Sequence, residues 1–244
     1  MTFQLLPKMN KRKLSVSLLF FLCFCGTQLH AQLYEIGFHA GYNVSRLTVD
    51  EEQISDELYV SSGSLFNGGS FGIQFMAGPP KDQNAPFFKI IPSFLAEATL
   101  CRCGGNINLI STNRDNSKSL SKMEYLFYRG DYSAKFVANM KNLQFMIGPT
   151  FTTFFYSGVK VGRAEEYKYA GDQFSDFVVG YEFGLGYKVG SVTFSTRFQS
   201  QITNFGTETA LFPTEYRNYQ FKFMLAYFFL SKHKDANWGS IYWK

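Results

Sequence analysis

The chain has 244 residues, and the part after residue 31 contains no run of 18 consecutive apolar residues. A membrane-spanning helix needs about 20 such residues, so this part of the chain does not cross a membrane as helices. Cysteine and histidine are also scarce, at 4 and 3 residues in the whole chain. Such small numbers leave little material for catalysis or metal binding, and we expect no catalytic residue, no metal site and no cofactor.

Two of the cysteines lie in the first 31 residues, which leaves Cys101 and Cys103. One intervening residue would strain a disulfide between them, and two thiols alone do not make a zinc site. We interpret them as structurally incidental, or as part of a loop disulfide, rather than as a metal or redox site.

The first 31 residues have the pattern of a secretory signal peptide. Basic residues lie between Lys8 and Lys13, an apolar run covers 14–25, and Gly26 leads to Ala31. This predicts cleavage between Ala31 and Gln32. The segment holds four Lys or Arg and no Asp or Glu, so its removal lowers the formal net charge from +5 to +1. The remaining chain gives no electrostatic reason to expect nucleic acid as a partner.

Aromatic residues are abundant, with 28 Phe and 15 Tyr, and they recur at every second position. This period is typical of strands that have one apolar and one polar face. We expect a barrel over 32–229 and a periplasmic tail over 230–244. The predicted strands are 33–45, 69–78, 87–99, 123–137, 143–155, 177–189, 192–203 and 217–229.

The connections alternate between short and long. Short turns are expected at 79–86, 138–142 and Gly190-Ser191, and long polar loops at 46–68, 100–122, 156–176 and 204–216. This alternation is typical of outer-membrane proteins. The predicted fold class is all-β: an eight-stranded antiparallel transmembrane β-barrel with short periplasmic turns and long outer loops.

Alternation alone does not say which face is wet, because a soluble lipocalin-like barrel would place its apolar row inside. Here the apolar row is so rich in Phe and Tyr that it would overfill a narrow interior. The opposite row combines glycine with charge, which suits a crowded lumen in which charges must pair. We therefore predict a lumen charge network that holds the barrel shut; the alternative is a narrow path lined by charges. Its predicted members are Glu182, Lys188, Arg197 and Lys222.

Aromatic residues also recur near the ends of the predicted strands, as in the girdles at membrane interfaces. We expect this position for Tyr34, Tyr125, Tyr187, Tyr219, Tyr227 and Phe229. The predicted location is the outer membrane, with outer-membrane lipid as a partner.

Four short motifs, at 36–45, 183–187, 196–204 and 217–228, resemble in this order those of the PorT-like outer-membrane β-barrel family. Residues 36–45 resemble its Gly-x-Asn-x-Ser opening strand, and 183–187 its Gly-x-Gly-Tyr strand. Residues 196–204 resemble its Arg-Tyr…Thr-Asn strand, and 217–228 its closing strand. The resemblance implies an integral outer-membrane barrel. Members of this kind are required for type IX secretion, which implies a non-enzymatic accessory role with envelope or secretion-machinery proteins as partners.

Two other functions stay open. One is a small barrel that modifies lipid or binds a ligand; His39, on the polar row of the first strand, would be its candidate residue. The other is a purely structural barrel. The tail, which contains Trp238, Tyr242 and Trp243, is either loosely ordered or a docking segment for a partner.

Overall fold

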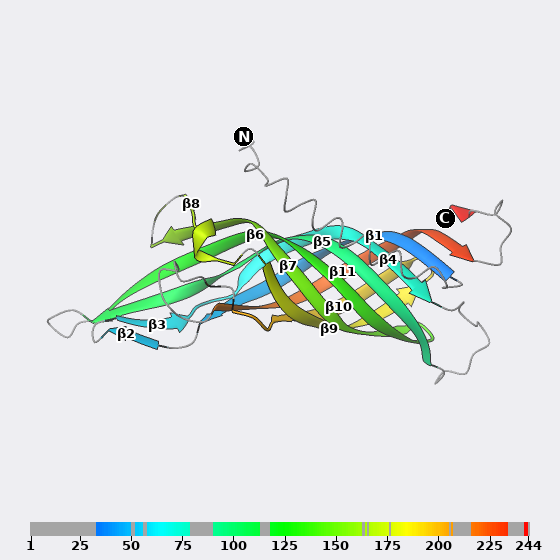
Figure 1. Ribbon diagram of the computed structural model, residues 1–244, viewed down its shortest axis with the longest axis horizontal. Coiled ribbons are helices and arrows are strands. Elements are labelled where there is room, and N and C mark those ends of the chain that lie inside the picture. Colours follow the sequence, from blue (N-terminus) through cyan, green and yellow to red (C-terminus); the bar gives the residue numbers. More distant parts are fainter. Residues whose placement is uncertain are drawn as a thin grey trace.

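In the computed structural model, the chain forms a closed barrel with an extension at one end (Figure 1). The structure describes residues 33–49, 52–55, 58–78, 90–112, 118–162, 164, 166–175, 177–204, 206, 216–233 and 242–243. The predicted signal peptide, its cleavage point at Ala31 and Gln32, and Trp238 lie outside the described residues. No helix among the residues described is long and apolar enough to cross a membrane.

The strands are long, and most run from one end of the barrel to the other. Their bounds, with those of one short 3-10 helix, are β1 (Leu33–Val49), β2 (Glu52–Ser55), β3 (Leu58–Ser62), β4 (Phe66–Gly78), β5 (Ile90–Thr112), β6 (Lys118–Met140), β7 (Leu143–Val161), β8 (Lys168–Tyr169), η1 (Gly171–Gln173), β9 (Phe177–Val189), β10 (Val192–Gln201), β11 (Tyr216–His233) and β12 (Tyr242–Trp243).

Eight of these strands close the ring, in the order β1, β4, β5, β6, β7, β9, β10, β11 and back to β1. Every pairing around the ring is antiparallel. Closure leaves the ring without an unpaired edge, which an apolar environment requires. The predicted fold class, an eight-stranded antiparallel barrel, is confirmed.

Turns and loops lie at opposite ends. At one end, β6 and β7 are joined through Lys141 and Asn142, and β9 and β10 through Gly190 and Ser191. β1 begins and β11 ends there too, beside the turns (Figure 1). The opposite end carries the connections from β1 to β4, from β5 to β6, from β7 to β9 and from β10 to β11. We call these the turn end and the loop end.

The loop end contains more sheet than predicted. Residues 100–122 were expected to form a loop, but β5 and β6 stay paired as far as Thr112 and Lys118. β3 pairs with the outer part of β5, and β2 pairs with β3. The loop prediction for 100–122 was wrong because pairing between β5 and β6, together with the addition of β3, extends this hairpin beyond the ring.

The last strand is also longer than predicted. The barrel was expected to stop at residue 229, whereas β11 continues to His233. β12 pairs with β11 at Leu230 and Ser231, just past the point where β10 stops pairing with it. Part of the predicted tail is thus added to the sheet.

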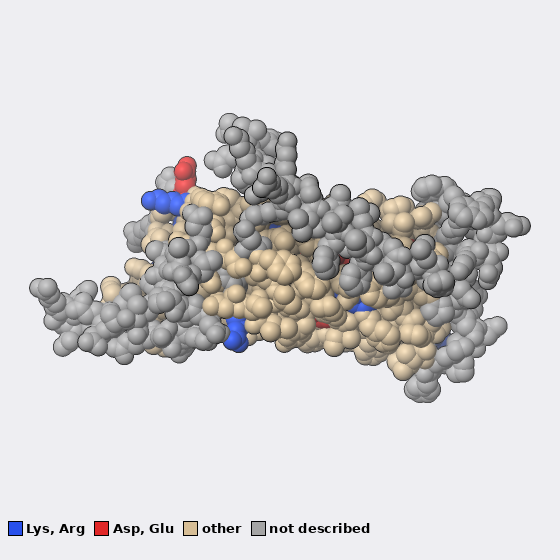
Figure 2. Space-filling view, viewed as in Figure 1, with Lys and Arg blue, Asp and Glu red and all other residues tan. Residues whose placement is uncertain are grey.

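The wall of the barrel is apolar and the interior is polar. Outward-facing aromatic residues are half exposed, such as Phe183 at 48% and Phe223 at 52%, while their neighbours Glu182 and Lys222 are buried. Figure 2 shows a largely uncharged surface along the described wall. An apolar exterior around a polar interior is the organisation of a transmembrane β-barrel.

Candidate functional site

The barrel interior contains a group of ion pairs contributed by five strands, which we call the central network. Inward-facing positions hold Glu97 on β5, three charges on β6, Glu182 on β9, Arg197 on β10 and Lys222 on β11. The three charges of β6 are Arg129, Asp131 and Lys135. All seven side chains are buried, so each depends on its partners rather than on water.

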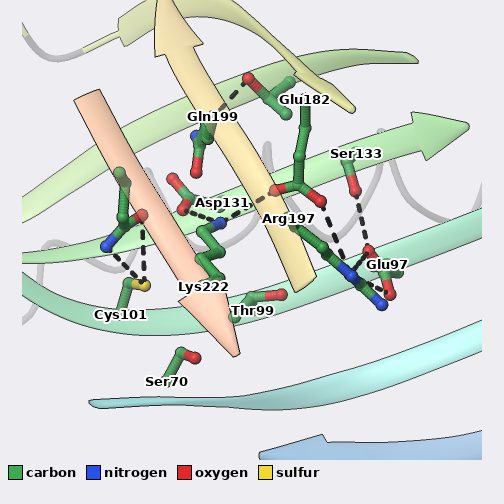
Figure 3. Close-up of polar contacts among 12 residues, drawn as sticks. Ser70, Glu97, Thr99, Cys101, Asp131, Ser133, Glu182, Arg197, Gln199 and Lys222 are labelled. Carbon is green, nitrogen blue, oxygen red and sulfur yellow. Dashed lines mark hydrogen bonds and ion pairs between the residues drawn. The ribbon is translucent and has the colours of Figure 1, made fainter. Parts of the chain in front are cut away.

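Two glutamates link the cations at one side of the network (Figure 3). Arg197 Nη1 lies 2.7 Å from Glu97 Oε2 and 3.5 Å from Glu182 Oε1. Lys135 Nζ forms ion pairs with the same two glutamates. These pairs join β5, β6, β9 and β10 across the lumen, so they connect strands that do not all neighbour one another in the ring.

The other side of the network is centred on Asp131. Lys222 Nζ lies 3.1 Å from Asp131 Oδ2 and 3.0 Å from Glu182 Oε2, so it connects the two sides. Arg129 Nε lies 3.1 Å from Asp131 Oδ1. Thr152 donates a hydrogen bond of 2.7 Å to the same aspartate.

Neutral side chains complete the coordination of the charges. The guanidinium of Arg129 donates to Asn218 at 3.1 Å, to Gln220 at 2.8 Å and to Gln199 at 3.3 Å. Ser133 donates to Glu97 at 3.3 Å. Because these amides and hydroxyls add hydrogen bonds between the charged groups, the network is a connected unit rather than a set of isolated pairs.

Glycine makes the room that these long side chains need. A Cβ atom placed on Gly184 would lie 2.8 Å from Cγ of Arg197 and 2.9 Å from the carbonyl oxygen of Thr196. A Cβ atom on Gly72 would lie 2.6 Å from Nε2 of His39. The glycines on the inward rows of β9 and β4 therefore allow charged and imidazole side chains to lie flat against the wall.

Apolar layers enclose the network on both sides. Towards the turn end, a layer of five side chains includes Leu95 and Val137, the next inward-facing residues after Glu97 and Lys135. The layer consists of Met76, Leu95, Val137, Met146 and Phe228. We call it the lower seal.

Towards the loop end, the inward rows also become apolar. Going from the network towards the loop end, the next inward-facing residue after Arg129 is Phe127. In the same direction Asn218 is succeeded by Tyr216, and Ser45 by Leu47. Phe174, from the segment between β7 and β9, packs edge-on against Tyr125, Phe127 and Tyr216 at centroid distances of 5.5, 5.1 and 5.7 Å. We call this aromatic group the upper seal. With both seals in place, the described interior is organised as a packed core.

The four residues predicted to form the lumen charge network lie in two different parts of the interior. Glu182, Arg197 and Lys222 lie in the central network, whereas Lys188 forms an ion pair with Glu35. Lys188 Nζ also lies 4.4 Å from the ring centroid of Phe228, a residue of the lower seal. The sequence analysis missed Glu97, Arg129, Asp131 and Lys135, all of which lie on the strands with the least regular alternation.

The aromatic residues predicted at the interfaces also separate. Tyr187 and Tyr227 are exposed on the wall, while Tyr34, Tyr219 and Phe229 are partly buried there by ring contacts with Phe75, Phe198 and Phe38. Their position at a membrane interface stays a prediction. The expectation for Tyr125 was wrong, because this side chain faces inward and is fully buried in the upper seal.

His39 and the cysteines are part of the interior packing. His39 is 2% exposed, and its Nε2 lies 2.9 Å from Thr99 Oγ1. Cys101 and Cys103 are free thiols on β5 and are buried, and Asn43 donates to the Cys101 sulfur at 3.3 Å. Among the described side chains, no three His, Cys, Asp or Glu residues are grouped to hold a metal ion.

Comparison with known proteins adds limited detail. No family model and no curated protein matches the chain, so membership of the PorT-like family stays a prediction. One similar structure is Ail, the attachment invasion locus protein of Yersinia pestis, in complex with the heparin analogue sucrose octasulfate: 12% identity, TM-score 0.42, covering 80% of this chain and 99% of Ail. Another is Neisserial surface protein A: 10% identity, TM-score 0.41, covering 78% of this chain and 96% of that one. At these values, the barrel assignment rests on the strand pairing of this chain itself.

Proposed function

We propose that the protein is an integral barrel of a bacterial outer membrane that assists protein secretion by binding other envelope proteins, without catalysing a reaction. The observation that carries the membrane location is the aromatic wall around a buried ionic interior. Half-exposed rings on neighbouring strands, such as Phe183, Phe194 and Phe223, would expose a large apolar surface to water. In a membrane, acyl chains would cover this apolar surface and keep water away from it. The closed ring leaves no unpaired strand edge towards the acyl chains.

The enclosed interior supports a binding role rather than a conducting one. The central network lies between the lower and upper seals, and the interior of an eight-stranded barrel is just wide enough for side chains to fill it. Contact with partners is thus left to the outer surfaces: the wall, the tail, and the sheet of β2, β3, β5 and β6 that extends from the loop end.

The enzyme alternative centres on His39, which has no accessible position. His39 is 2% exposed, and its imidazole forms a hydrogen bond with Thr99. It lies beside Glu97 of the central network. A lipid substrate would have to pass a seal and disrupt ion pairs to reach it. This burial favours a non-enzymatic role.

Deletion of the gene tests the secretion role. We expect cargo proteins that normally reach the cell surface to accumulate in the periplasm, and the full-length gene to restore their export. Co-purification from the outer membrane in mild detergent should then recover a secretion protein at fixed stoichiometry. Normal export in the deletion strain would exclude the secretion role and leave a structural barrel.

A further inference from the structure

Two arginines occupy the point where the apolar wall ends on the loop side. On β1 the outward row runs through Phe38, Ala40, Tyr42 and Val44 to Arg46, and on β5 it runs through Ala96, Ala98 and Leu100 to Arg102. Both arginines are exposed. Among the described outward-facing residues of β1, β4 and β5, these two arginines are the only charged ones.

The two arginines flank the same strand, β4, which pairs with β1 on one side and β5 on the other. Asn67 of β4, also exposed, lies opposite Val44, two residues before Arg46. An amide donor therefore lies on β4, the strand between the two strands that carry the arginines. Arg102 carbon Cζ lies over the Phe66 ring, 5.5 Å from its centroid, within the range of a cation–π contact. Such a contact uses the face of the guanidinium, whereas hydrogen bonds to phosphate use its N–H groups.

Gly69 on β4 leaves a gap in the row of outward side chains between Tyr42 and Arg102, which we call the notch. Tyr42 lies opposite Gly69 on β4, and the pairing of Ser70 with Cys101 places Arg102 next to Gly69 on the other side. A Cβ atom on Gly69 would have a single neighbour within 4 Å, the carbonyl oxygen of Gly41 at 3.8 Å. Across β5, Arg102 lies opposite Tyr128, which is 43% exposed. The notch over Gly69 is thus open, with Arg102 on one side and Tyr42 on the other.

We propose that Arg46, Asn67 and Arg102 bind the phosphate of an acyl lipid in the outer leaflet, with part of that lipid seated in the notch over Gly69. A planar guanidinium binds phosphate through two parallel hydrogen bonds, and the charge makes these bonds stronger than neutral ones. The apolar wall leads directly to this point, so one lipid can contact the wall with its chains and the arginines with its headgroup. The inference rests on the proposed membrane location.

The test is native mass spectrometry of the purified protein in mild detergent after incubation with diphosphoryl lipid A. We expect the wild type to retain bound lipid A, and inorganic phosphate not to displace it. The double variant Arg46→Gln/Arg102→Gln should retain at least about tenfold less, since each removes a charge-assisted bond. Gly69→Val, which fills the notch at a position with space for a side chain, should also reduce retention.

The matched control is Lys122→Gln/Lys141→Gln, which removes the same charge from exposed sites on β6 and in the turn after it. It should retain lipid A as the wild type does. Equal losses in the two double variants would mean unspecific attraction and would overturn the proposal, as would full retention by Arg46→Gln/Arg102→Gln. A protein that stays monomeric without detergent and takes up no lipid would refute the membrane location itself.

Discussion

At the scale of the residue, the buried charged side chains are the ones whose replacement should reduce the stability of the barrel most. Glu97 contacts Arg197, Lys135 and Ser133 and is 1% exposed. Removing one partner of a buried ion pair leaves the others in a region that cannot solvate them. The cost is therefore much larger than for a charge on the surface.

For Glu97→Gln we expect a loss of about 3 kcal/mol in the free energy of unfolding, because Arg197 and Lys135 keep their charges without this carboxylate. Urea titration of the protein in detergent, followed by the mobility shift of folded barrel on gels, measures it. Glu166→Gln, at an exposed loop position, is the control and should change the value by less than about 0.5 kcal/mol. A similar effect of both substitutions would refute the structural importance of the network.

For Gly184→Ala we expect a loss of about 1–3 kcal/mol, because the new methyl group would push against Arg197 and the backbone of β10. Gly69→Ala, on the open outer wall, should cost far less. Thermal unfolding in the same detergent compares the two. If both variants unfold at the wild-type temperature, Arg197 is not confined as the structure has it.

At the scale of the element, the regular strands could be predicted and the irregular ones could not. The predicted strand 177–189 coincides with β9, Phe177–Val189, because large apolar residues alternate with Gly, Glu and Lys from Val179 to Val189. β5 carries Pro92, Ala96 and Ala98 on its outward row. These small outward residues blur the pattern, and this explains why Glu97 was not placed in the lumen.

The outer hairpin was missed for a different reason. Residues 100–122 contain Gly104, Gly105 and many polar side chains, a composition typical of loops. Their strand structure depends on pairing between the consecutive strands β5 and β6 and on the addition of β3, which comes from an earlier part of the chain. Local composition does not report such contacts. The upper seal was missed likewise, because Tyr125 on its inward row looked like a membrane-interface residue.

The two short turns give a prediction at this scale. Lys141 has φ of 54° and Gly190 has φ of 58°, a region that costs a residue with a Cβ atom about 1–2 kcal/mol. Lys141→Gly should therefore raise the free energy of unfolding by about 1 kcal/mol, and Gly190→Lys should lower it by a similar amount. Urea unfolding curves of the two variants should shift in opposite directions; shifts in the same direction would contradict the turn geometry.

At the scale of the whole molecule, the fold is inside out relative to a soluble protein. Ionic and amide side chains fill the centre, two apolar layers enclose them, and aromatic side chains cover the wall. Among the described residues, these side chains pack against one another from the lower seal to the upper seal. The protein's proposed work in secretion and its proposed lipid site therefore both lie on outer surfaces.

The most direct test of the central claim, that the aromatic wall contacts acyl chains, is fluorescence quenching by lipids with brominated chains. Trp238 and Trp243 are first replaced by Phe, and one new tryptophan is introduced by Phe183→Trp on the wall or by Leu120→Trp on the exposed outer hairpin. After insertion into vesicles, brominated lipids should quench the tryptophan at 183 strongly and the one at 120 weakly. Equal, weak quenching at both positions would contradict the account.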